Sequence, residues 1–252
     1  MVTGLRDCVS STYNVYSCIV LDLVESTIQK DERSEREDSQ VKSVRGKFTT
    51  YSKNVALSLI KKYRADARSI SAYLGYLERA LSGLPLLTRV ELEVTTPLVV
   101  HVRSPYMPLE IGLAWHPFFN APYIPATTLR GALRAAAPAG VCGRSSEELF
   151  GHKKAAGLLI VTDALPVSEE VLGADVITPH YREPDAVEEH KVRPTPIVFP
   201  VVKPGAKFVF FLASEEDSLV RCMGDLLRVV DAALERGIGA KTRVGYSRAK
   251  RV

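Results

Sequence analysis

The residues best suited to chemistry are gathered in one stretch of the sequence, residues 237–246, which read GIGAKTRVGY. Glycine permits positive φ angles and close approach of the backbone to a ligand, and successive backbone N–H groups in such a loop can form a concave site for an anion. Two cations add positive charge, and a tyrosine ring offers a surface on which a base could stack. The sequence therefore predicts phosphate binding here, by Gly237, Gly239, Lys241, Thr242, Arg243, Gly245 and Tyr246.

A structural alternative explains the same residues without a ligand. A helix is expected over residues 217–235, and a glycine just after a helix commonly forms its C-cap. The stretch would then be a tight turn from helix to strand, with its cations in water. Both interpretations remain open at the level of sequence.

Known nucleotide-binding motifs do not fit this stretch. A P-loop places four residues between its first glycine and Gly-Lys-Thr and continues into a helix. Here Lys241 follows Gly239 after Ala240 alone. The dinucleotide fingerprint needs a preceding strand and a later acidic residue, whereas a helix is expected before Gly237. We therefore expect no cofactor, and an extended polyanion remains the best ligand class.

A second cationic pair precedes this stretch by about a hundred residues. Thr127 and Thr128 are predicted to cap a helix over residues 129–136. Arg130 and Arg134 lie four residues apart on one face of that helix. Free N–H groups and the helix dipole favour an anion at a helix start, so the two arginines predict a second phosphate site.

Composition narrows the function classes. The net charge of +4 and pI near 8.8 permit nucleic acid as a partner without requiring it. The four cysteines are scattered, so we expect neither a zinc site nor a disulfide framework. No secretory leader and no apolar run approaching about 20 residues is seen, which predicts a cytoplasmic protein without a membrane partner.

The periodicity of apolar residues changes along the chain. Residues 1–87 are predicted to be a helical N-terminal region, in which residues 30–47 form either a solvated helix surface or a mobile connection. Residues 88–252 mix strands and helices without regular alternation, which favours an α+β sheet domain. The predicted strands cover residues 87–102, with a bend, and 157–164. A hairpin is predicted from residues 194–202 and 207–212, and residues 175–192 are predicted to be irregular.

Three segments resemble the RAMP superfamily of CRISPR effector proteins. They are the glycine-rich stretch 237–246, residues 124–134 (IPATTLRGALR), and residues 175–181 (DVITPHY) followed by PTPI at 194–197. The third segment is most similar to the family of the sixth subunit of type III-B (Cmr) complexes. The sequence departs from the superfamily pattern at Ala126 and Ser247, where glycine is usual. Both replacements are small, so the two elements are expected to persist.

This resemblance implies a ferredoxin-like (RRM-like) core and a non-catalytic, RNA-binding subunit. The subunit would contact the 3′ part of a CRISPR RNA, and candidate partners include target RNA and other Cmr subunits. It would cap a ribonucleoprotein filament in antiviral defence. His180, in the third segment, joins the predicted RNA-binding residues, and no catalytic or metal-binding residue is expected.

Two other functions are compatible with the sequence. A metal-independent endoribonuclease needs a general base, a general acid and a cation, which His180, Tyr181 and Lys191 could supply. A subunit that contacts only proteins would use residues 237–246 as a turn. RNA cleavage would identify the endoribonuclease. RNA affinity would distinguish an RNA-binding subunit from one that contacts only proteins.

Overall fold

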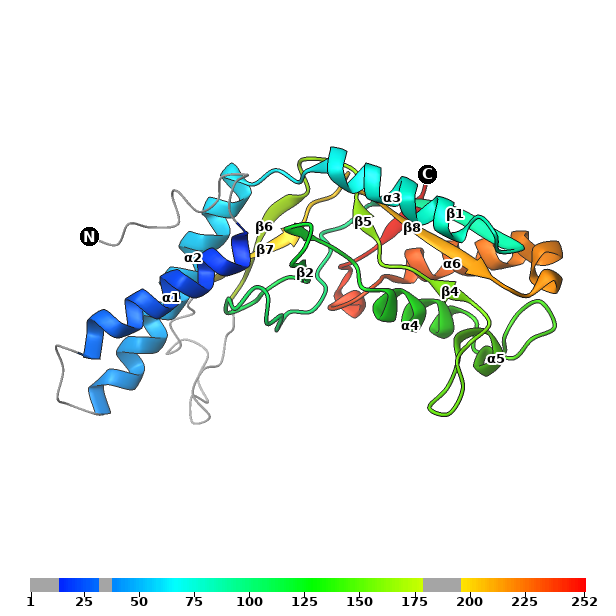
Figure 1. The fold of residues 1–252 in the computed structure, drawn as a ribbon. Coiled ribbons are helices and arrows are strands. Elements are labelled where there is room, and N and C mark those ends of the chain that lie inside the picture. The colour runs from blue at the N-terminus through cyan, green and yellow to red at the C-terminus, as the bar shows by residue number, and fades with distance from the viewer. Residues whose placement is uncertain (1–13, 32–37, 179–195) are drawn as a thin grey trace, which may run out of the picture.

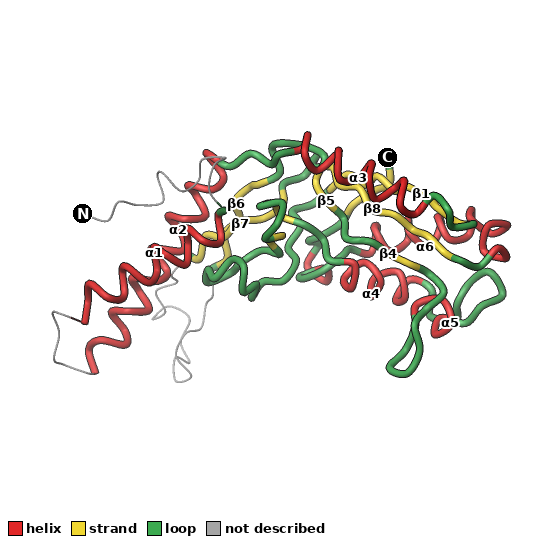
Figure 2. Tube along the Cα trace, viewed as in Figure 1, coloured by secondary structure: helices red, strands yellow, loops and turns green. Residues whose placement is uncertain are grey.

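The computed structural model describes residues 14–31, 38–178 and 196–252. Its helices are α1 (Val15–Asp31), α2 (Asp38–Lys62), α3 (Ala67–Leu81), α4 (Ala126–Ala136), α5 (Ser146–Phe150) and α6 (Met223–Arg236), with 3-10 turns η2 (Asp217–Cys222) and η3 (Thr242–Val244). Its strands are β1 (Leu86–Val94), β2 (Trp115–His116), β3 (Ala121–Pro122), β4 (Ile160–Val161), β5 (Leu165–Pro166), β6 (Leu172–Ile177), β7 (Ile197–Val202), β8 (Lys207–Ser214) and β9 (Ala249–Arg251). The chain is thus α+β, as predicted, with antiparallel sheets (Figures 1 and 2).

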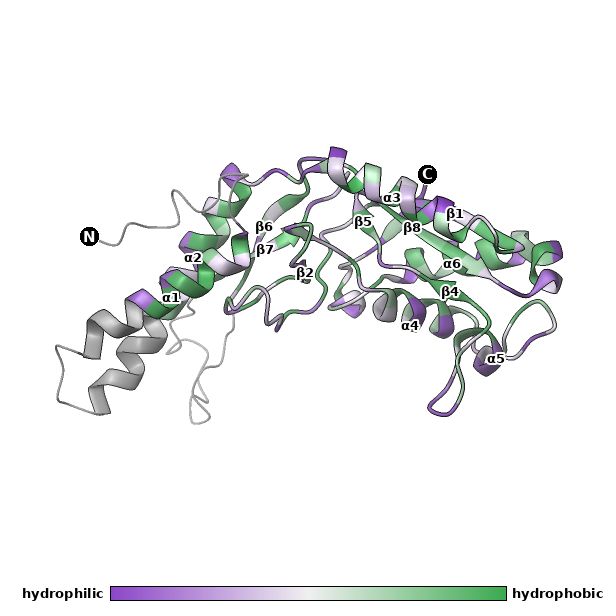
Figure 3. Ribbon diagram, viewed as in Figure 1, coloured by the Kyte–Doolittle hydropathy of each residue, from purple (hydrophilic) through white to green (hydrophobic). Residues whose placement is uncertain are grey.

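The largest sheet has the strand order β4-β8-β1-β9, and β5 also pairs with β8. The side chains of β8 alternate between its two faces. Phe208 and Phe210 pack in the cluster that contains the apolar residues of α4 and α6, whereas Val209 and Phe211 pack with those of α3. A strand buried on both faces needs apolar residues throughout, which explains the run of hydrophobic colour along β8 (Figure 3).

Helices α1 and α2 extend from one end of the molecule, and α2 packs on a second sheet formed by β6 and β7 (Figure 1). The Tyr51 hydroxyl of α2 donates a hydrogen bond to the Ile19 carbonyl of α1 (3.4 Å). Of the charged run 30–47, residues 38–47 belong to helix α2. Residues 32–37 lie outside the described residues.

The predicted hairpin of residues 194–202 and 207–212 is wrong. Strand β7 pairs with β6, from Leu172–Val202 to Ile177–Ile197, and β8 pairs with β1. The turn between β7 and β8 is bonded to β1, since the Gly205 N–H donates to the Val94 carbonyl (2.8 Å). Residues 172–177 are therefore strand, including the first part of the segment that was predicted to be irregular.

A disulfide joins Cys142, in the loop after α4, to Cys222 at the end of η2, with the Cα atoms 5.8 Å apart. Cys18 is also disulfide-bonded. The expectation of no disulfide was wrong because the two cysteines are 80 residues apart, and only the packing of α4 beside α6 brings their elements together. Within the described ranges, no helix has the length and apolar character to cross a membrane.

Candidate nucleic-acid interface

The predicted phosphate-binding stretch is a loop that follows α6, here called the glycine loop (residues 237–246). Gly237, Gly239 and Gly245 all have positive φ angles, of 104°, 111° and 90°. At Gly239 a Cβ atom would lie 2.7 Å from the Val99 carbonyl oxygen, so the backbone approach itself requires glycine. The glycines thus have a structural role, which leaves open whether the loop also binds a ligand.

Residues 97–100 hold the glycine loop in place. The Ala240 N–H donates to the Val99 carbonyl (2.8 Å), and the Ser247 N–H donates to the Pro97 carbonyl (2.9 Å). The buried Ser247 hydroxyl accepts from the Val99 N–H (3.0 Å) and donates to the Ala240 carbonyl (3.0 Å). Ser247 has a φ angle of 64°, a conformation that suits glycine. Its hydroxyl therefore explains how serine serves where the superfamily usually has glycine.

Six backbone N–H groups of the glycine loop are bonded to carbonyls of the protein, those of Gly237, Ile238, Ala240, Val244, Gly245 and Tyr246. Four others have no protein acceptor in the described part of the chain: Gly239, Lys241, Thr242 and Arg243. Unsatisfied donors next to two cations are the ingredients of an anion site. The loop can therefore present both backbone donors and positive charge to a phosphate.

Lys241 and Tyr246 form one unit in this loop. The Lys241 Nζ lies 5.2 Å from the centre of the Phe199 ring and 5.3 Å from that of the Tyr246 ring. The Tyr246 hydroxyl donates to Asp175 Oδ2 (2.5 Å), and this hydrogen bond, with burial, raises the pKa of Tyr246 to about 12. Tyr246 thus helps to position the ammonium group, a role that the expectation of base stacking did not include. Arg243 is exposed.

The second predicted site, at the start of α4, differs from the expectation. The helix begins at Ala126, after the N-cap residue Pro125, and the carboxylate of Asp163 satisfies its first N–H, because Oδ1 accepts from the Ala126 N–H (2.6 Å). The prediction that Thr127 and Thr128 cap the helix is wrong, because α4 begins before both of them. A carboxylate at a helix start already complements the dipole, which weakens the case for a phosphate at that point.

The two arginines of α4 have different surroundings. The Nε atom of Arg130 is shielded from solvent and has no hydrogen-bond partner among the described residues. Arg134 is exposed, and its Nη1 donates to the Gly151 carbonyl (3.3 Å). Arg236 Nη1, at the end of α6, donates to the Ala135 carbonyl (3.0 Å), so the helix before the glycine loop is tied to α4. His180, Tyr181 and Lys191 lie outside the described residues.

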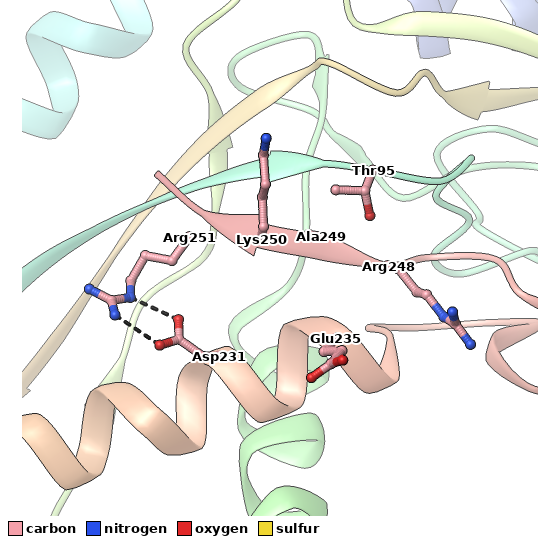
Figure 4. A pocket seen from close by; sticks show the side chains of 7 residues that line it. All are labelled: Thr95, Asp231, Glu235, Arg248, Ala249, Lys250 and Arg251. Atoms are coloured by element: carbon pink, nitrogen blue, oxygen red, sulfur yellow. Dashed lines mark hydrogen bonds and ion pairs between the residues drawn. The ribbon is translucent and has the colours of Figure 1, made fainter.

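A basic segment that the sequence analysis did not identify follows the glycine loop. Residues 248–251 line one side of an open groove of about 510 Å³, with Asp231 and Glu235 of α6 on the other side (Figure 4). Arg251 makes two hydrogen bonds to the Asp231 carboxylate, of 2.9 and 2.8 Å. Lys250 Nζ lies 3.4 Å from Glu93 Oε1. Arg248, at the opposite end of the groove from Arg251, forms no ion pair with the described residues. Its position directly after the loop was the available sequence signal.

The model of the RAMP superfamily matches residues 91–250, more than half of the chain. The chain therefore belongs to the RAMP superfamily. The match includes both α4 and the glycine loop.

Within the superfamily, the chain is similar to Cmr6. It is 26% identical to the CRISPR system CMR subunit Cmr6 of Saccharolobus solfataricus over 218 residues, which cover 84% of this chain and 75% of that protein. It is 30% identical to Cmr6 of Pyrococcus furiosus over 112 residues, 40% of this chain and 32% of that protein. A chain in the cryo-EM structure of type III-B Cmr-beta bound to cognate target RNA has the same fold, with a TM-score of 0.76 at 23% identity over 98% of this chain and 93% of that chain. The chain is thus a Cmr6-like RAMP protein.

Proposed function

We propose that this protein is a non-catalytic, RNA-binding subunit of a type III-B Cmr effector complex. It would contact the 3′ part of the CRISPR RNA and cap the backbone filament in antiviral, RNA-guided defence. The observation that carries the proposal is the glycine loop, which combines four N–H groups without a protein acceptor in the described chain with Lys241 and Arg243. The names of the Cmr6 relatives support assignment to this kind of complex.

The arrangement of the main sheet supports a ferredoxin-like core. Strand β1, α4 and the β4–β5 segment form one half, and β8, α6 and β9 form the other, with β1 and β8 adjacent at the centre. In this proposal residues 88–252 are the core, and residues 1–87 are a helical region packed beside it. If the protein acts in the cytoplasm, as this proposal has it, the Cys142–Cys222 disulfide must persist there, as disulfides do inside hyperthermophilic cells.

The loop would bind RNA through its phosphates. Backbone N–H groups and cations fix the position of a nucleic acid without reading its bases. This suits a subunit that must hold many different guide sequences. Lys241 is preorganised for such a contact by the Phe199 and Tyr246 rings, so little side-chain freedom is lost on binding.

The test is a titration of single-stranded RNA with the wild-type protein and with a double variant, Lys241→Ala with Arg243→Ala, at two salt concentrations. Each lost phosphate contact lowers the salt slope by about 0.7, so the double variant should lose about 1.4 in slope together with affinity. A matched control, Lys153→Ala with Lys154→Ala, removes two exposed cations between α5 and β4. Thermal melts of all three proteins confirm the fold.

Lower affinity and a shallower salt slope in the double variant alone would support the proposal. Equal affinity of wild type and double variant would refute the assigned contacts. No RNA binding by any of the proteins would favour the purely structural subunit, with RNA held by the assembled complex. RNA cleavage would overturn the non-catalytic assignment.

A further inference from the structure

A second cavity, of about 300 Å³, lies where α3, the β2–β3 turn and the segment between β4 and β5 meet. It is separate from the glycine loop, and no residue that lines it belongs to that loop. Its walls are formed by Tyr73 and Leu77 of α3, His116 and Phe119 of the turn, Ala126 at the start of α4, and Val161, Thr162, Asp163 and Leu165. The proposed RNA contacts leave this cavity unexplained.

Three aromatic rings form one wall of the cavity. The centres of the Tyr73 and Phe119 rings are 4.8 Å apart, and those of His116 and Phe119 are 4.7 Å apart. Tyr73 is 41% exposed, so the wall remains open to solvent. Phe118, next in the same turn, is 92% exposed. Phe118 does not line the cavity, but it is the neighbour of Phe119 in the chain, so a molecule that enters the cavity could also cover it.

The cavity is also lined by the carboxylate of Asp163, which can accept a further hydrogen bond. Asp163 uses Oδ1 to accept from the Ala126 N–H, and its second oxygen has no hydrogen-bond or ion-pair partner in the described chain. His116 does not compensate this charge near neutral pH, because burial lowers its pKa, although Asp163 acts in the opposite direction. Aromatic rings beside an unpaired carboxylate form an environment that attracts a cation.

We propose that this cavity receives an arginine side chain of a partner protein. The guanidinium would lie against the Tyr73 and Phe119 rings and donate to the free oxygen of Asp163, because its planar face stacks and its edge donates. Helix α3, which carries Tyr73, already shows an arginine against a tyrosine ring, since the Arg79 guanidinium lies 4.5 Å from the centre of the Tyr76 ring. The exposed Phe118 would be buried by the partner's surface.

The charge of the cavity argues against RNA as the occupant. A nucleotide brings a phosphate, which Asp163 would repel, whereas it adds attraction for an arginine. That the partner is a neighbouring subunit of the complex rests on the proposed function. The binding of a guanidinium in the cavity does not, so it is tested on the isolated chain.

The experiment is an NMR titration of the full-length protein with N-acetyl-arginine N-methylamide, followed through the backbone N–H signals of residues 116, 118, 119, 126 and 161–165. The matched probe is N-acetyl-citrulline N-methylamide, which has the same shape and no charge. We expect the arginine probe to shift these signals in the millimolar range, with affinity at least about fivefold above that of the citrulline probe. Cytidine monophosphate serves as the nucleotide probe.

Two variants test the named contacts. Asp163→Asn keeps an oxygen for the Ala126 N–H and removes the charge, so it should lower arginine affinity about fivefold. The melting temperature should fall only slightly, because a neutral amide no longer complements the dipole of α4 but still accepts the hydrogen bond. Tyr73→Leu keeps an apolar side chain and removes the ring, and should lower affinity about threefold. Equal binding of the two amino-acid probes, binding of the nucleotide alone, or no binding at all would overturn the inference. RNA affinity should change by less than about twofold in Asp163→Asn, which separates this test from that of the glycine loop.

Discussion

The Ser247 hydroxyl is the connection on which the shape of the glycine loop depends. It is fully buried and bonds to the Val99 N–H and to the Ala240 carbonyl, each at 3.0 Å. Ser247→Ala leaves both backbone groups without that partner, at about 1–3 kcal/mol for each buried group. Because Ala240 is only partly buried, we expect a loss in the lower part of the summed range, about 2–4 kcal/mol in the free energy of unfolding.

Ser247→Gly provides the matched comparison. It removes the same hydroxyl, but glycine adopts the observed φ of 64° without the steric cost of about 1 kcal/mol that a side chain carries there. The glycine variant should therefore be about 1 kcal/mol more stable than the alanine variant and still less stable than the wild type. This order differs from the usual preference for alanine over glycine, so it reports on the positive φ angle.

The assay is urea unfolding of the three oxidised proteins, followed by circular dichroism. An unchanged dependence on urea concentration would show that the same surface is exposed in each. A Ser247→Ala protein within about 0.5 kcal/mol of wild type would refute the role of the hydroxyl. A glycine variant less stable than the alanine variant would refute the argument from φ.

Two further predictions concern the disulfide and Tyr246. Replacement of Cys142 and Cys222 by serine should lower the free energy of unfolding by about 2–4 kcal/mol. This is below the roughly 4.5 kcal/mol that chain entropy gives for a separation of 80 residues. A loss under about 1 kcal/mol would contradict the prediction. NMR of ¹³Cζ-labelled tyrosine should place the pKa of Tyr246 at about 12 and, in Asp175→Asn, nearer to 10, whereas an unchanged value would exclude Asp175 as the cause. Because this folded-state pKa is raised, the stability contributed by the contact is complete below about pH 10 and is lost as the pH rises towards 12.

Local patterns predicted the elements that depend on local physics. The periodicity of apolar residues predicted helix within residues 1–87, and the structure has the helix α3 there, Ala67–Leu81. Glycines after an amphipathic helix predicted a tight loop, and all three of its glycines have positive φ angles. In each case neighbouring residues supply the cause, so the sequence was sufficient.

Partners distant in the chain could not be predicted in the same way. Turn residues 204 and 205 predicted a hairpin, yet β8 pairs with β1, because that pairing buries both faces of β8 under helices. Likewise Asp163 satisfies the first N–H of α4 from 37 residues away, and neither of the two threonines caps that helix. Strand pairing and capping depend on which elements meet, and a local pattern does not contain that information.

The sequence by itself determined the RAMP family, the α+β class and the position of the cationic glycine loop, because composition, spacing and motif are properties of the chain alone. Tertiary structure decided how that loop is held against the sheet, since the Ala240 N–H donates to the Val99 carbonyl and the Ser247 N–H to the Pro97 carbonyl. It also placed Lys241 between two rings, one from β7 and one from the loop. The aromatic and acidic cavity beside α4 exists only because α3, the β2–β3 turn and the β4–β5 segment pack together, and burial and proximity are consequences of folding.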